Sequence, residues 1–309
     1  MSPSPDNPAL SVIVPVLADT TTLADLHRAY RAALAAREAD GIEFVYVLDG
    51  ELAAARAALA DLHAAGEPVR VLAFNQSFGE AAALSVGFRH ARGARLLTLP
   101  AWEQVAPADI AAVVARLDQA DRVQGRRSGG RFGQGKLERA MRVLLNSPFG
   151  DLRCAVRALR REVADEIRIY GNQHRFLGLF ALRHGFVVHE VEVGQGRERP
   201  PSRSRMPVDL SLVLDAIAAF FLLRFVRRPF RFFGGFGLSV LALGGLATLW
   251  LVIDRLFLGV PLADRPALIL STLMIVLGMQ IIAVGLIGEI VTFAYTKDMR
   301  DYRVETIIG

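Results

Sequence analysis

Two hydrophobic patterns divide the chain. Before position 208, short apolar runs such as Ser11–Val16 and Glu43–Leu48 alternate with longer stretches of helical periodicity. Strands that alternate with helices predict a parallel sheet with helices on both faces. Ligands bind such sheets at the carboxyl ends of the strands. We therefore expect Pro15, Asp49 and the turn Pro100–Gln104 to line one crevice at that edge of the sheet.

The last hundred or so residues follow a different pattern. Neither Phe232–Ile253 nor Ala267–Gly288 contains a charged residue. Each run has about 20 residues, enough to cross the hydrocarbon core of a membrane as a helix. A pair of buried helices in a soluble protein is the alternative, but two charge-free runs of this length disfavour it. Basic residues flank the pair on both sides, so the positive-inside rule predicts a hairpin with both ends in the cytoplasm.

The segment between these two regions is apolar but interrupted. Asp209, Asp215 and Arg224 break its hydrophobic run, which favours a helix along the membrane surface over a third span. The polar N-terminus has no signal-peptide pattern, so we expect the first domain to stay in the cytoplasm. The predicted organisation is a cytoplasmic domain (1–207), an interfacial amphipathic helix (208–231), a transmembrane hairpin (232–295) and a cytoplasmic tail (296–309).

Composition and charge restrict the partners. Lys and Arg total 36 against 31 Asp and Glu, a net charge of +5, which fits anionic partners such as lipid head groups, phosphates or nucleotides. The charge is too diffuse to indicate a nucleic-acid partner, and no basic and aromatic platform is present. The single cysteine, Cys154, excludes a disulfide framework and a cysteine metal site. The six histidines show no metal-ligand spacing.

Several motifs resemble those of one family. The stretches SVIVPV, VLDG, FNQSFGEAAALSVGF and DLRCAVRALRREV are similar to inverting family 2 glycosyltransferases, especially the polyprenyl-phosphate sugar transferases such as dolichyl-phosphate mannose synthases and bactoprenol glucosyltransferases. The resemblance implies a GT-A, Rossmann-like mixed sheet with helices on both faces, followed by an interfacial helix and two transmembrane helices. It also implies a nucleotide-sugar donor, a polyprenyl-phosphate acceptor, a multi-pass inner-membrane location and a homo-oligomer, a tetramer in many relatives.

The chain departs from this family where a metal usually binds. Family members hold a divalent cation with an Asp-x-Asp pair, which stabilises the charge on the leaving diphosphate. Here Pro100 and Trp102 occupy those two positions. Glu103 is a single carboxylate nearby, a weak ligand at best for Mg²⁺ or Mn²⁺. We therefore expect no metal site of the usual kind, and Trp102 either stacks on a base or sugar or fills the metal position.

The resemblance assigns donor contacts to the carboxyl edge of the sheet. Asp49 keeps one of the two carboxylates in the family's VDDGS motif, although an Asp-Gly turn after a strand is common in any protein. The glycine-rich loop 125–136 is basic, and its guanidinium groups could clamp a diphosphate and partly replace a metal. The residues predicted to bind the nucleotide-sugar are Pro15, Asp49, Trp102, Glu103, Gln104, Arg126, Arg127 and Arg131.

The acceptor side depends on a second set of residues. Asp151 matches a family carboxylate near the acceptor and the sugar. A lipid phosphate is already anionic, so it needs orientation more than a strong base; Asp151 would align the sugar or act as the catalytic base. The alternative is a favourable charge at a helix start. The resemblance assigns the lipid phosphate to Arg197, Arg199, Ser204 and Arg205, which could equally form a basic patch attracted to anionic lipid.

Two functions stay open at this point. The first is an active inverting hexosyltransferase that moves a sugar from a UDP- or GDP-sugar to polyprenyl phosphate on the cytoplasmic face. The second is a catalytically inactive homologue that acts as a binding or scaffold subunit, supported by the joint loss of both metal carboxylates and of one nucleotide-motif Asp. We favour the transferase because Asp49, Gln104, Asp151 and the membrane hairpin are all retained.

Overall fold

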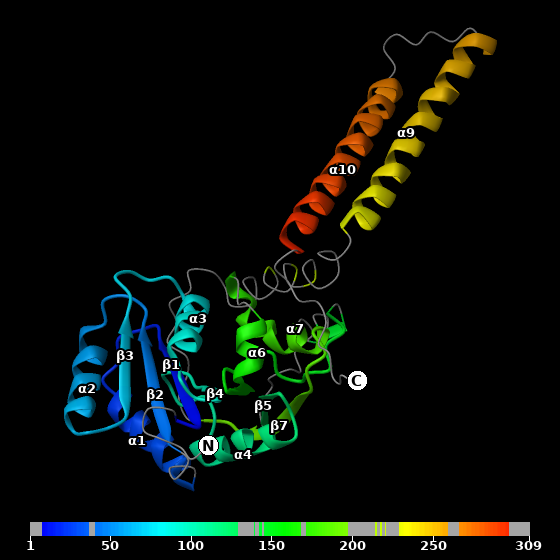
Figure 1. The fold of residues 1–309 in the computed structure, drawn as a ribbon. Helices are drawn as coiled ribbons and strands as arrows, with labels where there is room; N and C mark the ends of the chain where they lie inside the picture. Colours follow the sequence, from blue (N-terminus) through cyan, green and yellow to red (C-terminus); the bar gives the residue numbers. More distant parts are fainter. Residues whose placement is uncertain are drawn as a thin grey trace. The chain divides into compact units, whose positions relative to one another are not determined.

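The chain forms two compact units, Met1–Ala219 and Phe220–Gly309, each described by itself (Figure 1). The computed structural model describes residues 8–36, 41–128, 139, 142–143, 145–167, 171–196, 214, 217, 220, 229–258 and 266–296. The predicted interfacial helix (208–231) and the C-terminal tail (296–309) fall almost entirely outside these residues, so both stay predictions.

The first unit is built on a sheet of seven strands in the order β3-β2-β1-β4-β6-β5-β7. Within it, β6 alone runs antiparallel to both of its neighbours. The sheet is therefore mixed, as predicted. The strands are β1 (Leu10–Val16), β2 (Ile42–Leu48), β3 (Val69–Ala73), β4 (Arg95–Thr98), β5 (Arg122–Ser128), β6 (Arg157–Arg160) and β7 (Val188–Gly194).

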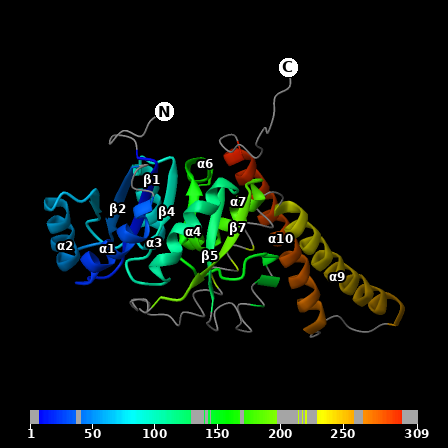
Figure 2. The ribbon, with the colours of Figure 1, turned by 90° about the horizontal axis from the view of Figure 1, so that it is seen from below.

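Helices cover both faces of this sheet (Figure 2). One face carries α1 (Leu23–Ala33), α2 (Ala53–Ala64) and α4 (Ile110–Ala115), whose buried side chains share one apolar core. The other carries α3 (Glu80–His90), α6 (Arg161–Glu166) and α7 (Leu177–Arg183), which share a second core. The described part of this unit also contains the short 3-10 helices η2 (Pro107–Asp109), η3 (Arg116–Asp118) and η4 (Gly171–Phe176).

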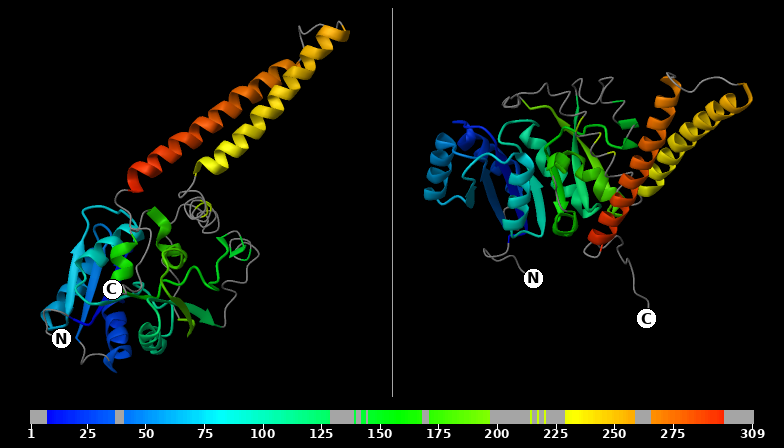
Figure 3. Two further views of the ribbon diagram at one scale, coloured as in Figure 1. Left: turned by 45° about the vertical axis from the view of Figure 1, so that its right-hand side comes forward. Right: turned by 90° about the horizontal axis from the view of Figure 1, so that it is seen from above.

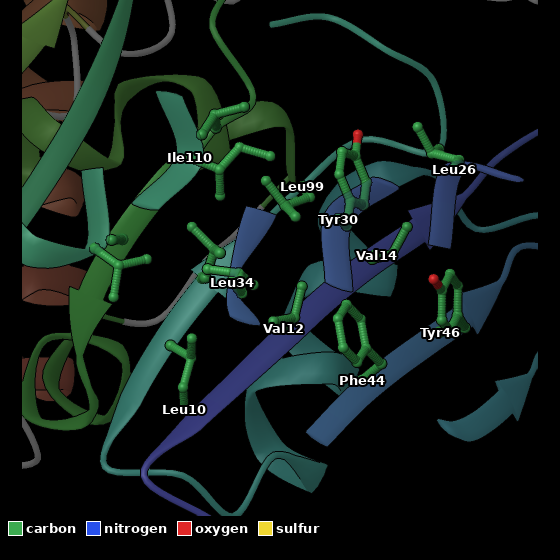
Figure 4. Packing of buried hydrophobic residues seen from close by; sticks show 14 of the residues in the cluster. Leu10, Val12, Val14, Leu26, Tyr30, Leu34, Phe44, Tyr46, Leu99 and Ile110 are labelled. Atoms are coloured by element: carbon green, nitrogen blue, oxygen red, sulfur yellow. The ribbon is translucent and has the colours of Figure 1, made fainter. Parts of the chain in front are cut away.

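The periodicity of α1 explains how it packs on the sheet. Its buried positions Leu23, Leu26 and Tyr30, with Leu34 just beyond, recur at spacings of three and four residues, which places them on one side of a helix. Figure 4 shows this side against Val12 and Val14 of β1. Full burial of one such side chain contributes about 1.5–3 kcal/mol, so this apolar stripe fixes the helix on the sheet.

The strand order places the candidate site. The chain adds β2 and β3 on one side of β1 and then adds β4 on the other side, so the order reverses between β1 and β4. Open α/β sheets bind ligands at such a switch point. Pro15 lies buried near the end of β1, paired with Val47 of β2, and the turn Pro100–Gln104 follows β4. Because β1, β2 and β4 are parallel neighbours, Pro15, Asp49 and this turn lie at the same edge of the sheet, and the crevice between them stays a prediction.

The second unit contains two long apolar helices, α9 (Pro229–Leu258) and α10 (Pro266–Thr296). Their candidate membrane spans have a mean hydropathy of 2.1 and 2.4, which confirms the predicted pair. Figure 3 shows the two helices side by side. They approach closely at glycines: a Cβ on Gly278 would lie 2.7 Å from the carbonyl oxygen of Gly237. Small residues allow membrane helices this backbone approach.

Candidate functional site

Asp49 holds the loop that leads into α3. Its carboxylate accepts hydrogen bonds from the Ser77 hydroxyl at 2.6 Å, from the Phe78 amide at 2.6 Å and from the Gly79 amide at 3.1 Å. The side chain is only 3% exposed. The charge also lies next to a helix N-terminus, which stabilises an anion. These contacts give Asp49 a structural role, and its contact with a nucleotide stays a prediction.

Asp151 and Arg127, which were predicted to contact different ligands, form a buried ion pair. The Arg127 Nε donates to one carboxylate oxygen at 2.7 Å and its Nη2 to the other at 3.1 Å. The Arg153 amide adds a further hydrogen bond at 2.9 Å. Paired donors of this kind make the strongest hydrogen bonds to a carboxylate. Asp151, predicted to act on the acceptor side, therefore contacts Arg127, predicted to bind the diphosphate.

Two local expectations about these residues are wrong. Arg126 and Arg127 lie in the regular strand β5, and not in a flexible loop, because β5 pairs with β7 as far as Ser128. Asp151 does not start a helix, because the segment after it runs into strand β6. Arg131 lies outside the described residues.

Gln104 ties the turn after β4 to the Asp151 segment. Its side-chain amide donates to the Arg153 carbonyl at 3.2 Å, and its side-chain oxygen accepts from the Ala155 amide at 2.7 Å. Its backbone carbonyl accepts from the Gly196 amide at 3.0 Å. Gly196 is the last described residue before the predicted lipid-phosphate segment. Arg197, Arg199, Ser204 and Arg205 themselves lie outside the described part of the chain, so their role stays a prediction.

The turn that replaces the family's metal motif is fixed by its backbone. The Tyr30 hydroxyl of α1 contacts the carbonyl oxygens of Pro100 and Trp102 at 2.9 and 3.2 Å. The side chains of Trp102 and Glu103 are half-buried. Within the described ranges, no group of three or more His, Cys, Asp or Glu side chains comes together to hold a metal ion. Pro100 and Trp102 offer no carboxylate at the two metal-motif positions, so Glu103 alone could hold Mg²⁺ or Mn²⁺ there, and only weakly.

Arg126 points to the face of β5 opposite Arg127. Its side chain is half exposed, and it pairs with Glu192 across the β5–β7 ladder at 3.4 Å. Next to it, Glu190 accepts from the amides of Gly150 and Asp151. Burial raises the pKa of Glu190 above its ordinary value, although these hydrogen bonds and the charge of Arg126 act in the opposite direction. Glu190 was not among the predicted site residues.

A second buried network links α3 to β6. The His174 Nε2 of η4 lies 3.3 Å from a carboxylate oxygen of Glu80, and the His174 carbonyl accepts from Arg157 at 2.8 Å. Desolvation raises the pKa of Glu80, but the His174 hydrogen bond and the charges of His174, Arg157 and Arg175 outweigh it and lower the pKa to about 2. Arg157 lies in the stretch DLRCAVRALRREV that carries the family resemblance, but the sequence did not indicate its contact with His174.

Arg122 adds a further buried cation on the same face of the sheet. Its side chain is fully buried and donates to the side-chain oxygen of Gln124 at 3.2 Å. Burial, with the nearby charge of Arg157, lowers the pKa of Arg122 to about 9. Buried cations cost folding free energy when no anion pairs with them.

The fold places the chain among proteins of the GT-A class. Glucosyl-3-phosphoglycerate synthase from Mycobacterium tuberculosis, solved with Mn²⁺ and uridine-diphosphate-glucose, matches with a TM-score of 0.53 over 70% of this chain and 79% of that one. The two sequences are 17% identical, so the likeness concerns the fold alone. A family model described as glycosyl transferase family 2 matches residues 11–225. The chain belongs to this family.

Two curated relatives extend the likeness beyond the first unit. The chain is 26% identical over 248 residues to the dodecaprenyl-phosphate galacturonate synthase of Rhizobium johnstonii, which covers 75% of this chain and 72% of that protein. It is 27% identical over 299 residues to the undecaprenyl-phosphate 4-deoxy-4-formamido-L-arabinose transferase of an Enterobacter species, covering 93% and 89%. The second match therefore includes the region of α9 and α10.

Proposed function

We propose that this protein transfers a sugar from a nucleotide-sugar to a polyprenyl phosphate at the cytoplasmic face of the inner membrane. The observation that carries the proposal is the Asp151–Arg127 pair, which Gln104 joins to the turn after β4 at the switch point of a family 2 fold. The two long apolar helices fit a membrane acceptor, with both chain ends cytoplasmic. The names of both curated relatives contain a polyprenyl phosphate.

The leaving diphosphate would be stabilised by guanidinium groups and not by a carboxylate-held cation. Negative charge develops on the nucleoside diphosphate as the glycosidic bond breaks, and preorganised donors lower the free energy of that state. Arg126 and Arg127 follow each other near the carboxyl end of β5, but their side chains lie on opposite faces, so we assign this contact to Arg127 and to Arg131, which follows soon after. Because Arg127 already binds Asp151, a diphosphate would compete with this carboxylate for the same guanidinium.

This competition suggests how donor and acceptor are coupled. When the Arg127 guanidinium turns to the diphosphate, the Asp151 carboxylate loses its two strongest hydrogen bonds. It then becomes available to orient the sugar or the lipid phosphate, which acts as the nucleophile and needs no strong base. Arg197, Arg199, Ser204 and Arg205 would hold that phosphate. The protein would act as a homo-oligomer.

The test is a transfer assay with the purified full-length protein. UDP- and GDP-sugars would be mixed with undecaprenyl phosphate in nanodiscs, with and without EDTA. We expect nucleoside diphosphate release and a glycosylated lipid, with turnover unchanged by the chelator. Replacing one charge-stabilising donor typically lowers kcat about 10²–10³-fold, so Arg127→Met should do so, whereas Arg116→Met, an exposed arginine of η3, should not.

The inactive homologue is the second candidate, and one observation favours it. The turn after β4 lacks both metal carboxylates, and Asp151 is already neutralised by Arg127. Under this alternative, UDP or GDP would raise the unfolding temperature while no donor gives turnover. If neither turnover nor a thermal shift appears with any nucleotide, the transferase proposal is contradicted.

A further inference from the structure

Asp151 is held through its backbone as well as through its carboxylate. Its carbonyl oxygen accepts a hydrogen bond from the side-chain amide of Gln124 in β5. On the other side of the residue, Glu190 of β7 accepts from the amides of Gly150 at 2.8 Å and of Asp151 at 3.4 Å. Side chains of the sheet therefore bind both peptide groups that flank the Asp151 Cα.

Gln124 and Glu190 are neighbours in the ladder between β5 and β7. The two strands are parallel, and Gln124 is the register partner of Glu190, so both side chains point to the same face of the sheet. One supplies a donor and the other supplies an acceptor to the same short segment. We call Gln124 and Glu190 the Asp151 clamp.

Arg122 sets the direction of the Gln124 amide. Both residues are fully buried, and the Nη1 and Nη2 of Arg122 each donate to the Gln124 Oε1 at 3.2 Å. A guanidinium offers donors only, so it holds the amide oxygen on its own side and turns the NH₂ group toward the Asp151 carbonyl. Without this cation the amide could flip, and its oxygen would then face another oxygen.

This contact gives a reason for a cation in the interior. Among the described residues, no carboxylate forms an ion pair with Arg122, and its Nε has no hydrogen-bond partner. The fold nevertheless makes room for it, because a Cβ on Gly178 of α7 would collide with the Arg122 Nη1. A buried cation without an anion costs folding free energy, and natural proteins accept such costs mainly at functional sites.

We propose that Gln124 and Glu190 are positioning residues that fix Asp151 opposite Arg127, and that Arg122 orients Gln124 for this role. Arg127 binds both carboxylate oxygens of Asp151, so a shift of the Asp151 backbone would misalign both hydrogen bonds at once. When Arg127 turns to a diphosphate, the clamp keeps Asp151 in place. This catalytic consequence rests on the proposed function, whereas the effect on the Asp151–Arg127 pair does not.

A double-mutant cycle tests whether Glu190 positions Asp151. Urea unfolding of full-length Asp151→Ala, Arg127→Met and the double variant in detergent gives the coupling free energy of the pair. The coupling should fall sharply when the cycle is repeated in Glu190→Ala. It should be retained in Glu190→Gln, because glutamine keeps an oxygen that accepts from the same amides. Glu192→Ala, an exposed neighbour on the same face, is the matched control and should leave the coupling unchanged.

Gln124→Glu separates positioning from packing. The variant keeps the size of the side chain and gives Arg122 a counter-ion, so a residue that only filled the core would tolerate the change. An ionised carboxylate has no donor for the Asp151 carbonyl, so we expect the Asp151–Arg127 coupling to fall in a protein that still folds. If Gln124→Glu did not fold, the contrast between Glu190→Ala and Glu190→Gln would decide alone. Retained coupling in a folded Gln124→Glu or in Glu190→Ala would overturn the inference.

Kinetics test whether the clamp matters for transfer. With the nucleotide-sugar that the transfer assay identifies, Glu190→Ala should lower kcat about 10²-fold, the loss that a misplacement of about 1 Å can cause. The KM for the nucleotide-sugar should not rise, and Glu190→Gln should restore most of the rate. Unchanged kcat in Glu190→Ala would overturn the positioning role. A wild-type protein without turnover would contradict the proposed function alone, because the coupling measurement needs no turnover and still decides the inference.

Discussion

Asp49 and Asp151 occupy comparable positions in two halves of one sheet, but they are held in different ways. Both are buried, with 3% of the side chain exposed, and both accept several hydrogen bonds. The donors to Asp49 are neutral, a hydroxyl and two backbone amides. The main donor to Asp151 is a guanidinium, which neutralises its charge.

The difference indicates which carboxylate can change partners. The amides around Asp49 belong to the loop and the start of α3, so releasing them would disturb the backbone. Arg127 is a side chain that can rotate, and an incoming anion could take its place beside the guanidinium. Both carboxylates match family motifs, but their roles differ. Asp49 stabilises the backbone of its loop, whereas Asp151 can exchange its partner when a ligand binds.

The largest effect is expected from breaking the Asp151–Arg127 pair. Asp151→Ala leaves a buried guanidinium without its anion, and losing one partner of a buried pair typically lowers the free energy of unfolding by about 3–5 kcal/mol. The measurement is urea unfolding of the full-length protein in detergent. The chain has two tryptophans, so a Trp250→Phe background leaves Trp102, near the pair, as the reporter.

The double variant separates the pair from its surroundings. Removing both charges in Asp151→Ala with Arg127→Met should cost less than the sum of the two single changes, because no buried charge is left unpaired. If the losses in free energy of unfolding were additive, Asp151 and Arg127 would act independently. The proposed difference between Asp151 and Asp49 would then be contradicted.

A smaller and pH-dependent effect is expected from Glu80, which joins the two halves through His174. Its pKa falls from 4.5 to about 2 on folding, so its contribution to stability is full above pH 4.5 and is lost as the pH falls toward 2. About a quarter of the side chain is exposed, so we expect about 2–3 kcal/mol at neutral pH.

The matched variant for this link is Glu80→Gln. The difference in free energy of unfolding between it and the wild type should shrink between pH 4.5 and pH 2. If the difference stayed constant over this range, the Glu80–His174 contact would stabilise the fold through packing and not through its charge. Glu162→Gln, an exposed carboxylate of α6, serves as the control and should show no such change.

The sequence predicts the outline of this molecule better than its polar interior. Alternating apolar runs predict β1 to β4 and their helices, and charge-free runs predict α9 and α10, because burial and the membrane each impose a simple spacing. The alternative interpretation of Asp151, a charge at the start of a helix, is wrong because the chain after it leads into the strand Arg157–Arg160. Two pairings in the sheet decide this, and local propensity cannot anticipate them.

The sequence also did not predict which residues the site residues would contact. Asp151 and Arg127 lie 24 positions apart, and Glu80 and His174 lie 94 apart, so only the assembled fold brings them together. The sequence identified Asp49, Gln104 and Asp151 as candidates, but it could not show that each already has hydrogen-bond partners inside the fold. That knowledge comes from packing, which places donors from several elements around one side chain.

Asp49→Asn should have an intermediate effect. The amide keeps one acceptor oxygen but turns an NH₂ group toward the donors of the loop, so one or more buried N–H groups lose their acceptor. A loss of about 1–2 kcal/mol in the free energy of unfolding is expected. Ser77→Ala removes only the hydroxyl donor and should cost less. If Asn were neutral, the hydrogen bonds of Asp49 would not hold the loop.

The smallest effect is expected at the turn between the two halves. Tyr30→Phe removes the hydroxyl that contacts the Pro100 and Trp102 carbonyls but keeps the buried ring. One such hydrogen bond contributes about 1 kcal/mol. Because the turn carries Trp102, its fluorescence in the Trp250→Phe background should also change, while Tyr46→Phe, a buried tyrosine elsewhere in the same core, should leave that emission unaltered. An identical Trp102 spectrum in both variants would mean that Gln104 alone fixes the turn beside the Asp151–Arg127 pair.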